Sequence, residues 1–450
     1  MLRKAAPAWG NASKRELQQV IHSSLAPAVA ASYAWSAVVL SQDGSQLYAD
    51  RALTAVVPAS TQKLVVADAA LTSFGPHYRF HTLFVAAKPP QDGTLAGNLW
   101  LVGSGDPSLR SSDLQRGVQK LHAQGLQRVD GGVCVDASAF MGPELNPHWN
   151  PADANEDFMT AISAVSIDED TVEFRILGTS SGATANVWTR PQSAVVQYYG
   201  SVRTSDADDV IVAATGTPNL FRLAGDIPPG VREIFYLPVH GIASYAGDLL
   251  TRFLRDAGIA VARPPSIGHA PVQAQTLWDH PSPEMTQLIH HMLIFSDNHF
   301  AEQFLRALGG LSRTASDAGG LAAEIHVVRL QGVPLGGLHL VDGSGLAPDD
   351  RVAAMTLARI LAHADANPQG NLLYPLLARG GLDGTLRWYH FAQARGRVRA
   401  KSGHLASVSS LAGYIDTRRH GRVVFAFLFN GAPDVADRAI VNAVDQIAQR

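Results

Sequence analysis

Three short motifs hold the residues of this chain that could do chemistry together: Ser60–Lys63 (Ser-Thr-Gln-Lys), Ser296–Asn298 (Ser-Asp-Asn) and Lys401–Gly403 (Lys-Ser-Gly). A serine hydroxyl is a weak nucleophile and needs a nearby base to remove its proton as it attacks. Lysine can be that base once its ammonium loses a proton, whereas an arginine guanidinium effectively never does. The three motifs in this order predict a hydrolase that forms an acyl-enzyme on serine.

The placement of lysine supports the first and third motifs. The 450 residues include 36 lysines and arginines, and only positions 4, 14, 63, 88, 120 and 401 are lysine. A serine followed by lysine three residues later occurs only at Ser60. A chain that uses arginine for most of its positive charges has therefore placed lysine in both motifs.

Each motif alone also has a common structural explanation. Ser-x-x-Lys is often a helix-cap serine beside a surface lysine, while Ser-Asp-Asn and Lys-Ser-Gly are typical of caps and turns. All three motifs in order, each in a suitable predicted element, favour catalysis over these explanations.

The first motif supplies a nucleophile and its base. We expect Ser60 to attack and Lys63 to act as the general base. Because free lysine has a pKa near ~10.4, the pKa of Lys63 must fall by roughly 3 units, which disfavours the ammonium by about 4 kcal/mol. A desolvated helix N-terminus beside Lys401 is expected to do this.

The other two motifs supply proton relay and substrate binding. We expect Ser296 to relay a proton between Lys63 and the leaving amine, and Asn298 to orient Lys63 and the substrate amide. Lys401 is expected to stay charged and, from an edge strand, to hold a substrate carboxylate together with Ser402.

The backbone near the third motif is expected to contact the substrate. Gly403 lets the substrate backbone approach closely because glycine has no side chain. The backbone N–H groups of Ser60 and His404 are the predicted oxyanion hole.

Hydrophobic periodicity and turn residues predict the elements that position the motifs. Ser60 and Lys63 are expected on one face at the start of a helix, with Ser296 and Asn298 on the connection between two helices. The third motif precedes a predicted hairpin. The expected elements are strands at 34–40, 46–49, 410–415 and 423–429, and helices at about 60–74, 285–295, 299–308 and 434–449.

Between the first and second motifs the pattern changes. Short strand-like runs dominate, at 99–102, 172–177 and 210–214, helical pattern is scarce, and a helix is expected at 242–256. We therefore predict an α+β fold with a discontinuous catalytic domain, residues 1–85 and 269–450. Residues 86–268 are expected to be a β-rich insertion of one or two small domains.

Composition excludes several classes of protein. With 46% hydrophobic and 17% charged residues the chain is typical of globular proteins, and a net charge of -3 without basic runs argues against nucleic acid as a partner. No apolar run reaches the ~18 residues of a membrane-spanning helix. The lone Cys134 excludes an internal disulfide and is expected in a buried strand.

Other candidate signals carry little weight. Arg3 and Lys4 could open a signal peptide, but the following segment is only weakly apolar, so no convincing export signal is seen. Gly178–Gly182 fits a Gly-x-Ser-x-Gly elbow, yet no helix is expected after it. The histidines at positions 290, 291 and 299 and Glu302 lack metal-site spacing, and the histidines are expected on a helix surface, so neither metal nor cofactor is predicted.

Seven segments together resemble one family over nearly the whole chain. They are 57–64, 74–80, 103–107, 295–298 with Glu302, 342–346, 383–386 and 410–414. They resemble the low-molecular-mass class C penicillin-binding proteins, the S13 D-alanyl-D-alanine carboxypeptidase/endopeptidase family. The resemblance implies a penicillin-recognising serine transpeptidase-like (β-lactamase-like) catalytic domain, interrupted after its first motif by extra domains.

The resemblance also implies substrates, inhibitors and a location. The substrates would be peptidoglycan stem peptides ending in D-Ala-D-Ala and their cross-links, β-lactams would be covalent inhibitors, and the protein would work outside the cytoplasmic membrane. The family usually has threonine where Ser402 and His404 stand, and a second acidic residue after Asp136 where Ala137 stands. Asp136 is thus a candidate for binding the diamino acid of the substrate.

Two alternatives stay open at this stage. One keeps the fold and assigns β-lactamase or esterase turnover. The other is a non-catalytic protein that binds the cell wall, in which the bulky His404 blocks the oxyanion site.

Overall fold

The computed structural model describes residues 9–311, 315–367 and 370–450, and it divides into two compact units. Met1–Tyr78 and Glu284–Arg450 form one unit, and Arg79–Pro283 form the other. Arg3 and Lys4, on which the export prediction rests, lie outside the described residues. Within the described part of the chain, no helix is both long enough and apolar enough to span a bilayer.

The first unit is built on a six-stranded antiparallel sheet with the order β2-β1-β24-β23-β22-β21. Its central strands are almost entirely buried, which explains their long apolar runs. Both predicted hairpins are present. The strands are β1 (Ser32–Ser41), β2 (Gln46–Asp50), β21 (Ala378–Arg379), β22 (Val398–Leu405), β23 (Val408–Asp416) and β24 (Arg422–Gly431).

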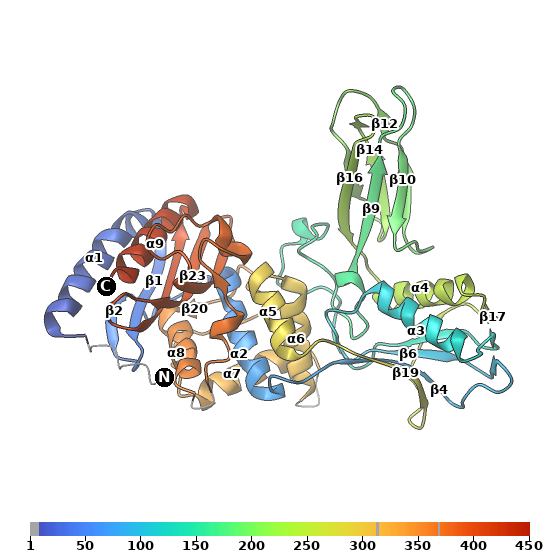
Figure 1. Ribbon diagram of the computed structural model, residues 1–450, viewed down its shortest axis with the longest axis horizontal. Coiled ribbons are helices and arrows are strands. Elements are labelled where there is room, and N and C mark those ends of the chain that lie inside the picture. The colour runs from blue at the N-terminus through green and yellow to red at the C-terminus, as the bar shows by residue number, and fades with distance from the viewer. Residues whose placement is uncertain (1–8, 312–314, 368–369) are drawn as a thin grey trace. The chain divides into compact units, whose positions relative to one another are not determined.

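Helices cover both faces of this sheet (Figure 1). On one face, α1 (Asn11–Ala30) and α9 (Pro433–Ala448) pack against alternate residues of β1 and β24. On the other face lie α8 (Ala354–Asp365) and, preceded by the 3-10 turn η1 (Ala59–Gln62), α2 (Lys63–Phe74). Because most residues of α2 are apolar and they do not gather on one face, the helix is buried along most of its length.

Three further helices surround α2: α5 (Met285–Phe295), α6 (Asn298–Gly310) and α7 (Asp317–Leu330). The predicted helices at 285–295 and 299–308 are confirmed, although α6 begins at Asn298 and includes Gly309 and Gly310. Helices α1, α7 and α8 were not predicted. In α7 the glycines interrupt the hydrophobic periodicity that would predict a helix. Gly320 is needed because a Cβ there would clash with the carbonyl of Leu305 on α6.

The smaller elements of this unit connect the motif-bearing ones. A two-stranded ladder joins β3 to β20, and 3-10 turns precede and follow β21. They are β3 (Ala55–Val56), β20 (Val352–Ala353), η4 (Tyr374–Leu376) and η5 (Gly384–Trp388).

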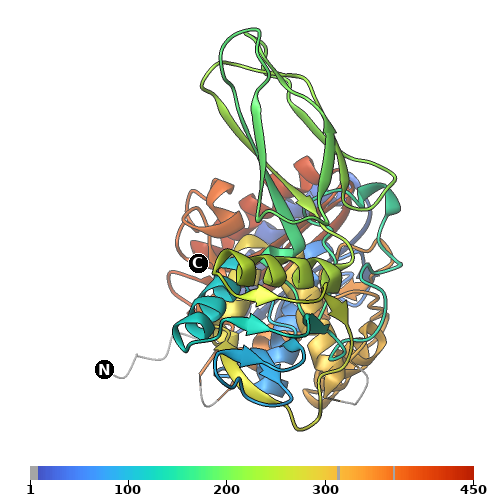
Figure 2. The ribbon, with the colours of Figure 1, turned by 90° about the vertical axis from the view of Figure 1, so that its right-hand side faces the viewer.

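The unit Arg79–Pro283 contains a five-stranded mixed sheet with the order β18-β8-β6-β4-β19. Two helices, α3 (Ser111–Ala123) and α4 (Ile242–Asp256), lie side by side against it (Figure 2). The helix at 242–256 is confirmed, whereas α3 corrects the expectation of little helix in this region. The strands are β4 (His81–Ala86), β6 (Leu99–Val102), β8 (Val133–Asp136), β18 (Ser266–Ile267) and β19 (Gln275–Pro281). Cys134 is buried in β8, as predicted.

Short strands make up the other sheets of this unit, with the orders β17-β7-β5, β10-β9-β16, β11-β14-β13 and β12-β15. No helix follows Gly178–Gly182 before the next strand, so the elbow context is absent there, as expected. The strands are β5 (Thr94–Leu95), β7 (Arg128–Val129), β9 (Thr171–Leu177), β10 (Asn186–Arg190), β11 (Gln197–Gly200), β12 (Arg203–Thr204), β13 (Ile211–Ala214), β14 (Leu220–Ala224), β15 (Asp226–Ile227), β16 (Arg232–Pro238) and β17 (Ala260–Val261), with 3-10 turns η2 (Pro151–Asp153) and η3 (Asp168–Asp170).

Candidate active site

Ser60 lies in the 3-10 turn η1 rather than in the α-helix that was predicted to start there. The preceding Ala59 has a φ of 49°, a left-handed conformation that costs a non-glycine residue roughly 1–2 kcal/mol. Neighbouring residues hold the turn, because the Pro58 carbonyl accepts hydrogen bonds from Thr61 Oγ1 at 2.7 Å and from Ser410 Oγ at 2.6 Å. The strained turn leaves Ser60 partly exposed at the head of α2.

Lys63, the first residue of α2, is fully buried and reaches Ser60. Its Nζ lies 3.0 Å from Ser60 Oγ, 2.7 Å from Asn298 Oδ1 and 2.8 Å from the carbonyl oxygen of Ser344. Burial lowers the pKa of Lys63 to about 8, although nearby carboxylates, Asp342 first among them, oppose the shift. A buried amine with a lowered pKa, at hydrogen-bond distance from a hydroxyl, can accept the hydroxyl proton.

Lys401 is also fully buried, on β22, and it contacts the second motif. Its Nζ donates to Ser296 Oγ at 2.8 Å and to the carbonyl of Ser402 at 2.6 Å. Burial and the nearby Lys63 lower the pKa of Lys401 well below that of free lysine. This direction opposes the expectation that Lys401 stays charged; an incoming carboxylate would restore its charge.

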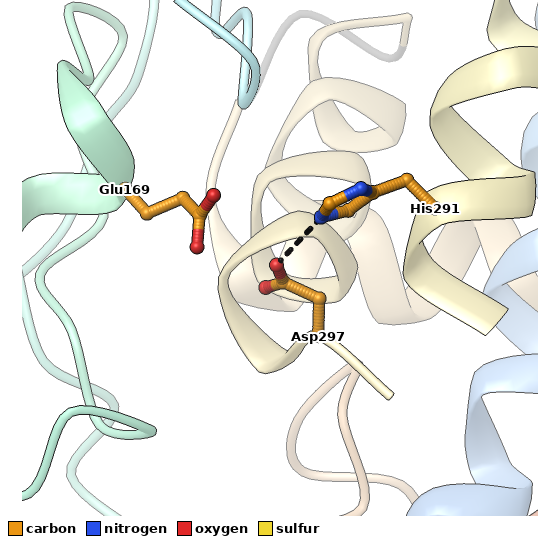
Figure 3. Close-up of side chains that lie close together, drawn as sticks. All are labelled: Glu169, His291 and Asp297. Atoms are coloured by element: carbon orange, nitrogen blue, oxygen red, sulfur yellow. Dashed lines mark hydrogen bonds and ion pairs between the residues drawn. The ribbon is translucent and has the colours of Figure 1, made fainter. Parts of the chain in front are cut away.

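A tight corner between α5 and α6 presents Ser296 and Asn298. Ser296 ends α5 with a left-handed φ of 62°, and Asp297 caps α6 by accepting a hydrogen bond from the Phe300 N–H at 3.2 Å. Figure 3 shows the second support of the corner, a 3.3 Å hydrogen bond between His291 Nε2 and Asp297 Oδ2. Burial raises the pKa of Asp297, but hydrogen bonds from His291 and Phe300 and the nearby histidines outweigh it, so the pKa is lowered.

The loop of residues that contacts Lys63 through the carbonyl of Ser344 was not among the predicted site residues. This loop, residues 342–347, offers the Ser344 carbonyl to Lys63 and is itself fixed by buried carboxylates. Glu302 Oε1 accepts from the Gly343 N–H at 3.0 Å and the Ser344 N–H at 2.8 Å. Asp342 accepts from the Gly345 and Ala347 N–H groups at 2.6 and 2.8 Å. The family-like segments contained these residues, but nothing in their spacing gave the contacts.

Burial raises the pKa values of several carboxyl groups near this loop, which favours their protonated forms. Burial and the nearby Asp342 raise the pKa of Asp350 to about 10, so Asp350 carries a proton at neutral pH. The pKa values of the fully buried Glu302 and Glu324 are raised well above the ordinary range, first by burial. Fewer ionised carboxylates beneath Lys63 favour its neutral form.

The backbone of β22 offers a partly open edge beside Ser60. The Gly380 N–H donates to the Val398 carbonyl at 2.9 Å, so even-numbered residues of β22 direct their peptide groups toward the side of β21. Because β21 pairs only with Arg399 and Ala400, the His404 N–H faces the same side beyond the end of β21. β22 was expected to be the outermost strand, but β21 lies outside it. Beyond Ala400, this side of β22 has no partner strand among the described residues.

Gly403 is required by its neighbours. A Cβ at this position would lie 2.8 Å from the Ser60 nitrogen and 2.9 Å from the Thr61 nitrogen. Glycine therefore allows β22 to run directly beside the turn that carries Ser60.

Two side chains of β22 have partners that the sequence did not reveal. Ser402 Oγ lies 2.8 Å from Thr385 Oγ1, and His404 Nε2 lies 2.9 Å from Asp437 Oδ1 of α9. Burial raises the pKa of Asp437, but hydrogen bonds from His404 and Ser409 outweigh it, so the pKa is lowered. The imidazole of His404 is thus hydrogen-bonded to α9, while the backbone N–H of the same residue lies on the edge of β22.

The remaining predicted residues have local structural partners. Asp136, in the unit Arg79–Pro283, accepts from Ser138 Oγ at 2.5 Å and from the Ala270 N–H at 2.7 Å. Both of its carboxylate oxygens thus hold neighbouring loops. The Nε2 atom of His299 lies 3.3 Å from Gln303 Nε2, and His299 is buried, which corrects its expected place on a helix surface.

Comparison with known proteins matches residues 17–450 to the model of the D-Ala-D-Ala carboxypeptidase 3 (S13) family. The chain belongs to this family. A D-alanyl-D-alanine carboxypeptidase of Actinomadura sp. (strain R39) is 29% identical, over 98% of this chain and 86% of that protein. D-alanyl-D-alanine carboxypeptidase DacB of Haemophilus influenzae is 27% identical, over 86% and 83% respectively. Membership makes this S13 protein a serine hydrolase of the carboxypeptidase class.

Solved structures show the same fold. Penicillin-binding protein 4 (dacB) from Haemophilus influenzae matches with a TM-score of 0.83 and 24% identity, covering 96% of this chain and 99% of that one. The predatory peptidoglycan endopeptidase Bd3459 from Bdellovibrio bacteriovorus matches with a TM-score of 0.56 and 16% identity, covering 93% and 92%. The S13 protein therefore has the predicted α+β, penicillin-binding-protein fold.

Proposed function

We propose that this S13 protein is a serine-type D-alanyl-D-alanine carboxypeptidase that acts through an acyl-enzyme on Ser60. The observation that carries the proposal is the 3.0 Å contact between Lys63 Nζ and Ser60 Oγ, made by a lysine whose pKa burial lowers to about 8. A neutral amine at this distance accepts the Ser60 proton as the hydroxyl attacks the carbonyl carbon between the two D-alanines.

The remaining residues serve the two halves of the reaction. The negative oxygen that develops on the carbonyl is stabilised by the N–H groups of Ser60 and His404; loss of one such donor typically costs about 2.7–4 kcal/mol. Ser296, in contact with Lys401, relays the proton to the leaving D-alanine. Water then attacks the acyl-enzyme with Lys63 again as the base.

The substrate carboxylate is assigned to Lys401 and Ser402. An alkylammonium buried without a counter-charge is unfavourable, so a carboxylate that reaches Lys401 gains the attraction and restores the ammonium. This favours peptides that end in a free D-alanine. Asp136 stays a predicted contact for the diamino acid.

We further propose cleavage of D-Ala cross-links, covalent inhibition by β-lactams and a location outside the cytoplasmic membrane. The named activity of the Bdellovibrio endopeptidase, and structures of that protein acylated by penicillin G and of penicillin-binding protein 4 with a β-lactam, support the first two. Both cleavage reactions need the same centre. We also propose that residues 86–268 are the inserted region and 1–85 with 269–450 the catalytic domain; the division at Arg79 and Pro283 supports this.

Intact-protein mass spectrometry after incubation with benzylpenicillin tests the proposal. A gain of one penicillin on the wild type and none on Ser60→Ala is expected; covalent uptake by Ser60→Ala would refute the assignment of the nucleophile. Rapid turnover of a chromogenic cephalosporin without D-alanine release from stem peptides would favour the β-lactamase alternative. Peptidoglycan binding without acylation would favour the non-catalytic one, against which the His404–Asp437 hydrogen bond argues.

A further inference from the structure

A cavity of about 430 Å³ lies toward the C-terminal end of α2, away from Lys63 and within the same unit. Much of its wall comes from the last turns of three helices: Leu71 and Thr72 of α2, Val327 and Leu330 of α7, and His363 and Ala364 of α8. The C-terminal end of a helix carries roughly half a negative charge. Three such ends at one cavity give it a negative potential before any side chain is counted.

Asp68 of α2 is the only carboxylate that lines this cavity, and Gln331 at the end of α7, Thr72 and Asn367 add further acceptor oxygens. Asp68 is only 6% exposed, and the one hydrogen bond it receives among the described residues comes from Gln331 Nε2 at 2.7 Å. The other end of the same amide, Gln331 Oε1, is buried without a hydrogen-bond partner in the described part of the chain. Buried acceptors are normally paired, so this pair points to a donor that comes from outside.

The charge of Asp68 is poorly compensated. Burial raises its pKa to about 6, and the hydrogen bond from Gln331 offsets only part of this effect. At pH 7 the carboxylate is therefore mostly ionised in a site that disfavours the charge. Among the residues that line the cavity, His363 is the only other titratable group. A bound cation would recover the lost solvation of Asp68.

The rest of the wall decides what kind of cation fits. Apolar side chains from the three helices and from Leu372 and Leu373 surround the acceptors. Magnesium and calcium sites in proteins are built mainly on carboxylates, and Asp68 is the only carboxylate in this wall. A small organic cation with an alkyl stem fits both the acceptor groups and the apolar side chains of the cavity. The volume of the cavity lies in the range of ligand pockets.

We propose that this cavity binds an alkylammonium ion, with its ammonium group on Asp68 and Gln331 and its stem against the surrounding leucines. The ammonium donates hydrogen bonds to Asp68 and to Gln331 Oε1, and no covalent step is involved. The cavity is separate from the reacting groups, because Asp68 lies five residues beyond Lys63 on α2, roughly 7 Å along the helix. The inference does not depend on the proposed peptidase function.

Isothermal titration calorimetry of the full chain with n-pentylamine tests the proposal, with 1-pentanol as the neutral analogue. We expect one amine to bind per chain at pH 7.5, and 1-pentanol to bind at least about 10-fold more weakly. Asp68→Asn keeps the shape of the side chain and should weaken amine binding about 10- to 100-fold, the usual range for a charged hydrogen bond. The control is Asp434→Asn, an exposed carboxylate on α9, which should leave the affinity unchanged.

A second variant and a pH series separate binding from folding. Gln331→Leu removes the other acceptor and should also weaken the amine, while urea unfolding of each variant establishes that it is folded. Because Asp68 is protonated below its pKa of about 6, the affinity of the wild type should fall between pH 7.5 and 5. Equal amine affinity in wild type and Asp68→Asn, equal affinity for 1-pentanol, or binding of Mg²⁺ but not the amine would each overturn the proposal.

Discussion

Two buried ionisable side chains on α2, Lys63 and Asp68, differ in how completely they are paired. Lys63 contacts three oxygens of Ser60, Asn298 and Ser344, whereas Asp68 receives one hydrogen bond, from Gln331, among the described residues. Burial is the largest cause of both pKa shifts, downward to about 8 for Lys63 and upward to about 6 for Asp68. The two groups therefore differ in their hydrogen-bond partners and not in burial, in line with the proton transfer proposed for Lys63 and the ligand site proposed at Asp68.

The largest expected effect comes from removing the amine of Lys63. Lys63→Ala should lower the rate of Ser60 acylation by benzylpenicillin by about 10²–10⁴ or more, because the general base is lost. In the wild type the rate should rise with pH through about 8, since only the neutral amine accepts a proton and the folded pKa lies near that value. Stopped-flow acylation across pH 6–9.5 measures both; a normal rate in Lys63→Ala would contradict its role.

The second effect concerns the loop beneath Lys63. Glu302→Ala leaves the Gly343 and Ser344 N–H groups buried without partners, at about 1–3 kcal/mol each, so we expect a loss of about 2–6 kcal/mol in the free energy of unfolding. Glu302→Gln keeps an acceptor oxygen and should be close to wild type in stability. Urea unfolding of the pair measures this, and equal stability of both variants would show that the carboxyl does not hold the loop.

The third prediction concerns Asp68 and the pH dependence of the free energy of unfolding. Its folded pKa of about 6 lies above the unfolded value of 3.8, so the protonated form stabilises the fold. The full stability is present below pH ~4, falls as the pH rises to about 6 and stays lower above it, by up to about 3 kcal/mol. Asp68→Asn should remove this fall and be more stable than wild type at pH 7. Urea midpoints from pH 4 to 7 check it; parallel curves for both proteins would contradict it.

The smallest expected effect is at His404. The proposed oxyanion hole uses the backbone N–H of His404, which any residue except proline supplies, while the imidazole is bound to Asp437. His404→Thr, the residue usual in the family, should therefore change the acylation rate only a few-fold. A large gain in rate would mean that the imidazole obstructs the site, and the same acylation assay distinguishes the two results.

Much of the fold was predictable where periodicity and turn residues agree. The two hairpins of the central sheet and the helices at 242–256 and 285–295 follow from such local patterns. Helix α3 was missed although its buried Leu114, Val118 and Leu121 have helical spacing. Glycines hid the helical pattern of α7, and one of them, Gly320, allows close packing against α6, which the segment alone does not reveal.

The sequence by itself determined which residues could react, because Ser60, Lys63, Ser296, Asn298 and Lys401 are chemical types in recognisable local motifs. Only the tertiary structure decided their surroundings. It brought the carbonyl of Ser344 to Lys63, the carboxyl of Glu302 beneath that loop and the side chain of Asp437 to His404. These contacts join segments that lie far apart in the chain, and burial and pairing, which set the pKa values, exist only once those segments have packed.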